Sequence, residues 1–137
     1  MTEQEIADSL MKVYPSMDKL TKAEDRYSTF DYSNDKYLLE FKSRESKFDP
    51  WIIEQLKLDA NQAIALDEGK SFIFVIECKR IIYVWNISKM VDKQFDFRFH
   101  RKQLPNYTDL DDRDEQYKIF KMTGFIPISS CTKILYV

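Results

Sequence analysis

Residues 37–44 read Tyr-Leu-Leu-Glu-Phe-Lys-Ser-Arg, and this stretch decides both the predicted fold and the predicted site. Successive side chains of a β-strand point to opposite faces of the sheet. One face therefore receives Tyr37, Leu39 and Phe41. The other face receives Leu38, Glu40, Lys42 and Arg44. We expect a strand with one apolar face and one face that carries an acid, an amine and a guanidinium.

The residues before this stretch predict a partner strand. Residues 26–32 are rich in aromatic residues and Thr, and Ser33-Asn34-Asp35 has the composition of a turn. We therefore expect a hairpin of residues 26–32 with residues 37–43. A turn centred on Asn34-Asp35 would place Tyr32 opposite Tyr37.

This register would bring two carboxylates together. It pairs Asp31 with Leu38, so Asp31 shares the face of Glu40 at a diagonal separation of about 7–8 Å. Carboxylates at that spacing can share one hard cation such as Mg²⁺. A three-residue turn without a bulge would put Asp31 on the other face, so the interpretation depends on the register.

The predicted chemistry is metal-assisted hydrolysis of a phosphodiester. Mg²⁺ or Mn²⁺ held by Asp31 and Glu40 would polarise a phosphate oxygen and acidify a bound water. Lys42 would position that water or stabilise the charge that builds on the phosphorus. Arg44 is expected to bind a neighbouring phosphate.

The Glu-x-Lys pattern alone is weak, because it occurs four times in this sequence, beginning at Glu40, Glu45, Glu68 and Glu77. Two of these occurrences fall in predicted loops, and the one at Glu77 falls at a predicted hairpin tip. Glu40 alone lies on a strand that is paired with a strand bearing an aligned Asp. A plain cross-strand salt bridge is the alternative reading of these residues.

Helices are expected on both sides of the hairpin in sequence. Residues 2–14 predict a helix that opens with a Thr2/Glu5 capping box and ends near Pro15. Residues 51–66 predict a second helix, with Asp49-Pro50 as its N-cap and first residue and Gly69 at its end. Its expected apolar stripe is Ile52, Leu56, Ala60 and Ala63.

The second half of the chain is predicted to be rich in strands. Ser71–Ile76 and Ile81–Ile87 are apolar on both faces, as in strands covered on both sides, and residues 77–80 form their hairpin tip. Phe95, Phe97 and Phe99 alternate with polar residues, which predicts a half-buried strand. Residues 109–115 read as an acidic loop, and the tail from Tyr117 as one or two edge strands. The expected class is an α/β fold with a mixed central β-sheet flanked by helices.

Composition limits the function. A length of 137 residues fits one domain, and two Cys residues suit a reducing cytoplasm without a disulfide framework. No signal peptide or membrane-spanning run is visible. A net charge of −2 argues against a protein that coats nucleic acid without sequence preference, although a local basic groove is compatible with it. The candidates for such a groove beyond Arg44 are Arg98, Arg101 and Lys102, beside the only histidine, His100.

Phe30-Asp31, eight intervening residues and Glu40-Phe41-Lys42 resemble the D-x(n)-E-x-K signature of the PD-(D/E)XK nuclease superfamily. Phe30 stands where the signature has Pro. The resemblance covers about residues 2–87 and implies a restriction-endonuclease-like core in the order α-β-β-α-β-β, with residues 88–137 as a strand-rich C-terminal extension. Among the members, the chain is most similar to small phage-type or archaeal Holliday-junction resolvases and related phage endonucleases.

The resemblance adds two residues and a set of partners. Relatives place a further metal-binding Glu on the first helix, which here is Glu3, and a Lys or Gln on the helix after the motif, which here is Lys57, with Gln55 behind it. For both, a solvated helix charge is the alternative. The implied partner is nucleic acid, DNA in preference to RNA, with Mg²⁺ or Mn²⁺ as cofactor and host-cell cytoplasm as the location if the source is viral. Symmetric cutting of two strands would need a homodimer.

Other functions stay open at this stage. The same fold can serve as a catalytically inactive module that binds nucleic acid or protein. The same metal chemistry can also cut RNA. A third alternative is an unrelated α+β interaction domain that binds no metal.

Overall fold

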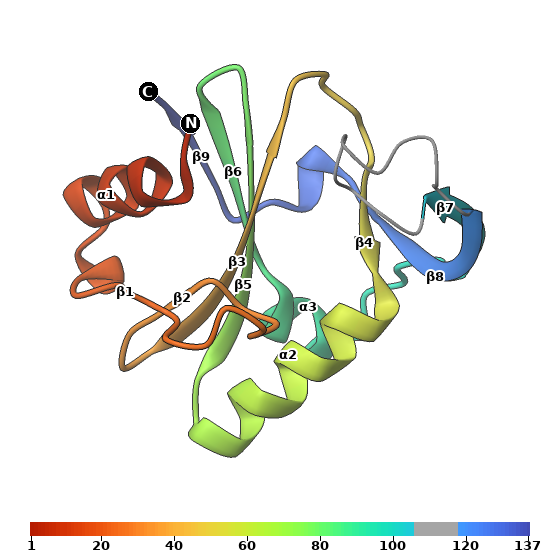
Figure 1. Ribbon diagram of the computed structural model, residues 1–137, viewed down its shortest axis with the longest axis horizontal. Helices are drawn as coiled ribbons and strands as arrows, with labels where there is room; N and C mark the ends of the chain where they lie inside the picture. The colour runs from red at the N-terminus through yellow and green to blue at the C-terminus, as the bar shows by residue number, and fades with distance from the viewer. Residues whose placement is uncertain (106–117) are drawn as a thin grey trace.

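A six-stranded mixed sheet runs through the centre of the computed structural model, which describes residues 1–105 and 118–137 (Figure 1). Its strand order is β1-β2-β3-β5-β6-β9. The strands are β1 (Thr21–Lys22), β2 (Tyr32–Ser33), β3 (Tyr37–Arg44), β5 (Ser71–Cys78), β6 (Ile81–Asn86) and β9 (Lys133–Tyr136). β3 and β5 are parallel and the other pairs are antiparallel. The predicted α/β class with a mixed central sheet is therefore confirmed.

The centre of this sheet forms where the sequence is apolar on both faces. Phe72–Cys78 of β5 and Ile82–Asn86 of β6 are all buried. Lys79 and Arg80 join the two strands in a tight turn with φ values of 51° and 64°, which suits the right-handed twist of a hairpin. The predicted hairpin is confirmed, except that Glu77 and Cys78 belong to β5 itself.

Helix α1 (Glu3–Val13) covers one face of the sheet (Figure 1). The Thr2 hydroxyl accepts from the N–H of Glu5 at 3.1 Å, and the Glu5 carboxylate accepts from the N–H of Thr2 at 3.0 Å, so the predicted capping box is present. A 3₁₀ turn (Pro15–Met17) follows the helix. The buried residues of this layer are Ile6, Ala7, Leu10, Met17, Leu20, Tyr32, Leu39, Phe41, Ile73, Val75, Ile82 and Val84.

The other face of the sheet is covered by α2 (Gln55–Glu68), α3 (Ile87–Asp92) and part of a second sheet (Figure 1). α2 ends at Gly69 in the left-handed region, with φ at 67°, as predicted. The second sheet has three antiparallel strands in the order β4 (Trp51–Glu54), β8 (Lys118–Ile126), β7 (His100–Pro105). α3 and the second sheet were not predicted. No helix within residues 1–105 and 118–137 has the length and apolarity to cross a bilayer.

The hairpin of β2 and β3 has a different register from the prediction. Tyr32 lies opposite Leu39, not Tyr37. The side-chain oxygen of Asn34 accepts from the N–H groups of Lys36 and Tyr37, both at 2.9 Å, which closes a longer turn. The shift is two residues, and two is the period of a strand, so Tyr32 and Ser33 keep their predicted faces.

The predicted strand 26–32 is mostly wrong. Only Tyr32 and Ser33 pair with β3, and residues 24–31 lie outside any helix or strand. The outer pairing of this region is made instead by β1, where Thr21 lies opposite Ser33.

The predicted start of the second helix is also wrong. Trp51–Glu54 form β4, the Asp49–Pro50 peptide is cis, and the helix begins at Gln55 without a side-chain cap. Pairing with β8 supplies the backbone hydrogen bonds of β4, and that partner lies about seventy residues further along the chain. The predicted apolar stripe of this helix is wrong as well, since Leu56 is 82% exposed. The buried residues of the helix are Leu58, Asn61, Gln62 and Ala65.

Two predictions for the second half of the chain need correction. Phe95–Phe99 form no strand, because Gln94 and Arg98 have φ values of 58° and 55°, yet their rings pack on one another and on the core. In the tail, β9 is an edge strand as predicted, whereas β8 is the central strand of the second sheet. The predicted acidic loop, 109–115, lies outside the described residues.

Candidate functional site

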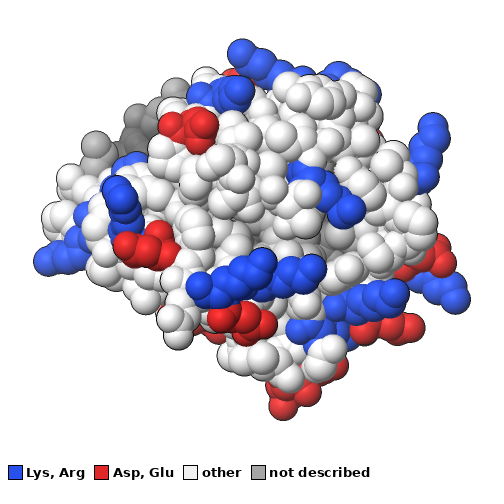
Figure 2. Space-filling model, turned by 180° about the vertical axis from the view of Figure 1, so that it is seen from behind, with Lys and Arg blue, Asp and Glu red and all other residues white. Residues whose placement is uncertain are grey.

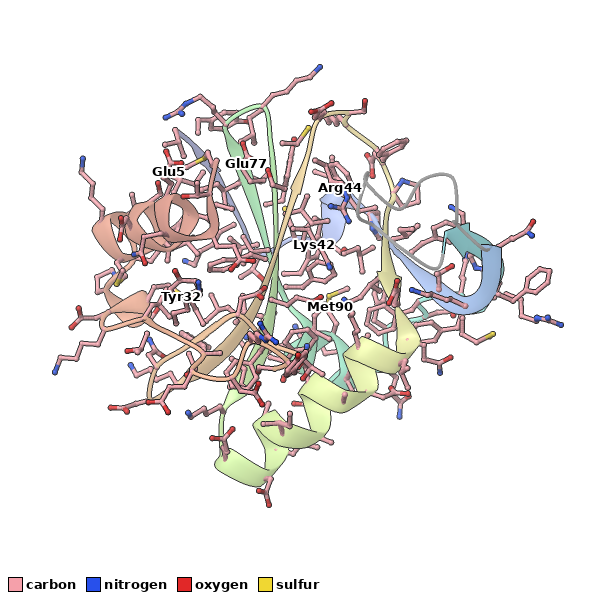
Figure 3. All side chains as sticks on the ribbon, viewed as in Figure 1. Glu5, Tyr32, Lys42, Arg44, Glu77 and Met90 are labelled. Carbon is pink, nitrogen blue, oxygen red and sulfur yellow. The ribbon has the colours of Figure 1, made fainter. Side chains whose placement is uncertain are left out.

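Glu40 and Lys42 lie side by side on β3, on the face that α2 and β4 cover. Glu40 is opposite Phe74 of β5 and is only 4% exposed, whereas Lys42 is half-buried opposite Ile76. Figure 3 shows Lys42 and Arg44 extending from β3 toward β4, whereas Tyr32 lies on the side of α1. The predicted alternation of β3 therefore places an acid and two cations on one face.

Two lysines neutralise the buried carboxylate. The Oε1 atom of Glu40 lies 3.3 Å from Nζ of Lys42 and 3.7 Å from Nζ of Lys57. Lys42 comes from the same strand, two residues on, and Lys57 comes from the first turn of α2. The structure therefore brings together three of the predicted residues, including the one named from the family resemblance on the second helix.

Asp31 is fixed to β3 on both sides of Glu40. Its N–H donates to the carbonyl of Leu39 at 2.8 Å, and its carboxylate Oδ2 accepts from the N–H of Phe41 at 2.7 Å. Asp31 lies just before β2, and the bond from its N–H to Leu39 does not continue the register of β2, in which Tyr32 is opposite Leu39. The charge of Asp31 raises the pKa of Glu40, so the two carboxylates lie within electrostatic range of each other.

Burial shifts the protonation of all three groups toward neutrality. Burial raises the pKa of Asp31, and the hydrogen bond from Phe41 and the charges of Lys42 and Lys57 oppose this only in part. Burial likewise raises the pKa of Glu40 against the opposing charges of the two lysines. Burial lowers the pKa of Lys42, although the charge of Glu40 raises it. A bound cation would favour the ionised forms of the two carboxylates and lower their pKa values again.

Glu3 lies within electrostatic range of Asp31 and Lys42. Its pKa is raised by burial first and then by the charge of Asp31, and Lys22 and Lys42 lower it. Within residues 1–105 and 118–137, however, no three acidic, His or Cys side chains lie close enough to hold a metal ion. The structure therefore does not join Glu3 to the two carboxylates as a third ligand.

The donor set of Asp31 and Glu40 fits Mg²⁺ or Mn²⁺. Mg²⁺ is commonly held by one or two carboxylates, and water and substrate phosphate oxygens supply its other ligands. One oxygen of each carboxylate already has a partner, Phe41 for Asp31 and the lysines for Glu40. Oδ1 of Asp31 and Oε2 of Glu40 accept no hydrogen bond from the described part of the chain, so each carboxylate keeps an oxygen for a cation.

A second Glu-x-Lys motif shows what a structural glutamate looks like in this fold. The Glu77 carboxylate accepts from the Ser43 hydroxyl at 2.6 Å and from the N–H of Arg80 at 3.0 Å. Burial alone would raise the pKa of Glu77, but these hydrogen bonds and the N-terminal ammonium group, 3.6 Å from the carboxylate, outweigh it and the pKa is lowered. Glu77 is thus held ionised by two neutral donors and the N-terminal ammonium group, whereas Glu40 is held between lysines.

A cleft of about 380 Å³ opens next to Glu40 and Lys42. Strands β3 and β5 form one side of it, and β4, β7 and β8 of the second sheet contribute to the other. Its basic lining residues are Lys42, Arg44, Lys57, Lys102 and Lys121. Its acidic ones are Glu40 and Glu54, and Lys121 pairs with Glu54 at 3.2 Å. Asp31 is not part of the lining.

Sequence reasoning identified four of the five lining cations and missed Lys121. It also missed the apolar wall of the cleft, which consists of Phe48, Pro50, Trp51, Ile52, Ile53, Phe74, Ile76 and Phe125. β4 and β8 contribute half of these residues, and no local pattern in the sequence predicts that the two strands pair.

Two of the predicted nucleic-acid contacts lie away from the cleft. Arg98 is exposed in a left-handed turn, and Arg101 lies over the ring of Phe120 at 4.3 Å. Arg101 and Lys102 point to opposite faces of β7, and only Lys102 lines the cleft. His100 stacks on Phe125, with ring centroids 4.8 Å apart.

The face of the molecule seen from behind carries charges of both signs. Figure 2 shows Lys and Arg side chains scattered over this face, with Asp and Glu side chains among them. The cleft, by comparison, is lined by five basic and two acidic residues in a chain whose net charge is −2.

Comparison with protein-family models, with curated proteins and with solved structures finds no match to this chain.

Proposed function

We propose that this protein is a divalent-metal-dependent nuclease, most readily a DNA endonuclease, in which Asp31, Glu40 and Lys42 carry the chemistry. One observation supports the proposal above the others. The Asp31 carboxylate is bound to the strand residue that follows Glu40, and its charge raises the pKa of Glu40, which lies beside the Lys42 amine. A buried carboxylate and an amine in a cation-lined cleft, with a second carboxylate nearby, suit the hydrolysis of a phosphodiester better than a structural role.

The residues of the chain divide the work. When bound at Asp31 and Glu40, Mg²⁺ or Mn²⁺ would supply Lewis-acid activation of the phosphate and a lower pKa for a bound water. Lys42 orients the attacking water and stabilises negative charge on the phosphate. Lys57 holds Glu40 in place and adds a second positive charge, and Arg44 binds a flanking phosphate.

The order of the elements also supports the proposal. α1 precedes the β2–β3 hairpin, and α2 lies between the parallel strands β3 and β5, as the family resemblance implies. β1 and β4 are additions to the expected order. The motif therefore lies on the strand that the D-x(n)-E-x-K signature would place at the centre of a mixed sheet.

Nicking of supercoiled plasmid DNA in the presence of Mn²⁺ tests the proposal. The wild-type chain should nick, and Asp31→Asn and Lys42→Ala should each lose about a hundredfold or more in rate. Lys12→Ala, an exposed lysine of α1, is the matched control and should nick like the wild type. Equal residual activity in wild type, Asp31→Asn and Lys42→Ala would point instead to a catalytically inactive binding module.

The substrate is resolved by a second set of measurements. Single-stranded RNA, single-stranded DNA and branched DNA are compared under the same Mn²⁺ conditions. We expect DNA to be cut faster than RNA, and faster cutting of RNA would make the protein an RNA endonuclease. Symmetric cuts across a branch would further require a homodimer, which sedimentation under the assay conditions would detect.

A further inference from the structure

Part of the cleft is not explained by binding of phosphate alone. Lys and Arg side chains recognise phosphate, and those of the cleft come from β3, α2, β7 and β8. Two phenyl rings, Phe48 and Phe125, line it as well. Phe48 is 58% exposed, so water covers an aromatic surface beside a cluster of cations. Such a surface suits a ligand that has a planar apolar part next to its anionic part.

The aromatic side chains of the cleft come from separate elements. Phe48 follows β3 and meets Trp51 edge-on, with ring centroids 5.6 Å apart. Phe125 lies on β8 and is backed by the His100 ring. Trp51 is 3% exposed, and its Nε1 donor has no hydrogen-bond partner among the described residues.

The size of the cleft selects among nucleic-acid ligands. A volume of about 380 Å³ falls within the range of small-molecule pockets, about 300–1,000 Å³. A whole duplex cannot enter a cleft of this volume. A single base that has left its stack is small enough, and each base has a face that stacks on an aromatic ring.

We infer that the cleft receives the base of an unpaired nucleotide, whose phosphate lies at Lys42 and Arg44. The inference rests on the proposed function and specifies its substrate as DNA that contains an unpaired nucleotide beside the scissile bond. The base stacks on Phe48 and Phe125, and the lysines of the second sheet, Lys102 and Lys121, bind the phosphate of the next nucleotide.

Fluorescence anisotropy in EDTA measures binding without cleavage. The probes are a labelled duplex, the same duplex with one unpaired nucleotide, and the single strand. Wild type should bind the two probes with an unpaired base more tightly than the duplex. Phe48→Ala should weaken binding of those two probes about fivefold or more and leave duplex binding unchanged.

The chain offers a closely matched control. Phe120 is 60% exposed on β8, nearly the same as Phe48, but it lies against Arg101 and away from the cleft. Phe120→Ala should therefore bind all three probes like the wild type. Phe125→Leu, which keeps most of the side-chain volume, is the second cleft variant and should lose the same preference as Phe48→Ala.

Three results would overturn the inference. The first is equal affinity of the wild type for paired and unpaired probes. The second is an unchanged preference in both cleft variants. The third is full competition by a free deoxynucleoside monophosphate at the concentration of the oligonucleotide, which would make the cleft a site for free nucleotides.

Cleavage with Mn²⁺ separates this inference from the proposed function. Nicking that shows no preference for the unpaired probe would overturn the inference and keep the nuclease. Preferred binding of the unpaired probe without any cleavage would support the inference about the ligand and reject the nuclease.

Discussion

The carboxylate of Asp31 accepts a hydrogen bond of 2.7 Å from the backbone N–H of Phe41, the residue that follows Glu40. The contact completes the edge of β3 beyond the point where β2 ends. It also fixes one carboxylate oxygen next to Glu40 and leaves the other for a ligand. Asp31 therefore has two roles, one in stabilising the fold and one in binding a ligand, and suitable substitutions should separate them.

Asp31→Asn and Asp31→Ala should differ in stability and agree in activity. The asparagine amide oxygen can still accept from the N–H of Phe41, whereas alanine leaves that N–H without its partner, at a cost of about 1–3 kcal/mol. Urea unfolding should therefore show a loss of stability for the alanine variant alone, and plasmid nicking should be lost in both. Equal stability of the two variants would mean that the Asp31–Phe41 hydrogen bond is not formed in solution.

The metal-free protein should lose stability relative to Asp31→Asn as the pH rises. Burial raises the pKa of Asp31 above its ordinary value of 3.8, so the folded state binds the proton more tightly than the unfolded state. The stabilising contribution of the group is complete below 3.8 and is lost as the pH rises through the higher folded value. Asparagine stays neutral, so the melting temperature of the wild type should fall below that of the variant over this window.

Mn²⁺ should reverse this difference. A cation that binds the ionised carboxylates stabilises the folded wild type by mass action and has less effect on Asp31→Asn. Asp59→Asn, at an exposed position of α2, serves as the control and should respond to Mn²⁺ like the wild type. Thermal melts with and without Mn²⁺ across the pH series check both expectations, and a wild type that gains no stability from Mn²⁺ would contradict them.

Lys57 and Lys42 both contact Glu40 but should not be equivalent. Lys42→Ala removes the amine nearest the proposed reacting phosphate, whereas Lys57→Ala removes a partner 3.7 Å from the carboxylate on a more exposed side chain. We expect Lys57→Ala to lower the nicking rate by about tenfold and Lys42→Ala by about a hundredfold or more. Equal effects in single-turnover assays would mean that both lysines act only by holding Glu40.

The second sheet should be sensitive to a methyl group at Gly124. A Cβ atom built there would lie 2.8 Å from Cε1 of Phe99 and 2.9 Å from Cβ of Phe97. Because Phe97 is buried and its carbonyl accepts from the N–H of Phe125 at 2.7 Å, this segment has little room to move. Gly124→Ala should cost about 1–3 kcal/mol in urea unfolding, and an unchanged midpoint would contradict this packing of Phe97–Phe99 on β8.

Local patterns in the sequence were sufficient for some elements and not for others. Thr2 and Glu5 begin α1 through contacts within one turn, and the alternation in β3 correctly placed Glu40 and Lys42 on one face. The helix predicted for Trp51–Glu54 was wrong, because these residues form a strand only through their pairing with β8. The residues around Trp51–Glu54 carry no sequence pattern that predicts pairing with a strand so far along the chain.

In the candidate site, too, some features follow from the local sequence and others depend on distant parts of the chain. The shift of register by two residues leaves Tyr32 and Ser33 on their predicted faces, whereas Asp31 lies outside the paired residues and the turn closed by Asn34 was not foreseen. Lys57 entered through a family resemblance, and the structure places it on Glu40. Lys121 and Phe125 could not be found, since their place in the cleft depends on how the second sheet lies against the first.

The central claim is that Asp31 and Glu40 bind one divalent cation between them, and calorimetric titration with Mn²⁺ measures this directly. At a pH above the raised pKa values of both carboxylates, the wild type should bind Mn²⁺ with measurable heat, and Asp31→Asn and Glu40→Gln should each bind about tenfold more weakly or not at all. A wild-type titration that cannot be distinguished from those of the two variants would contradict the account.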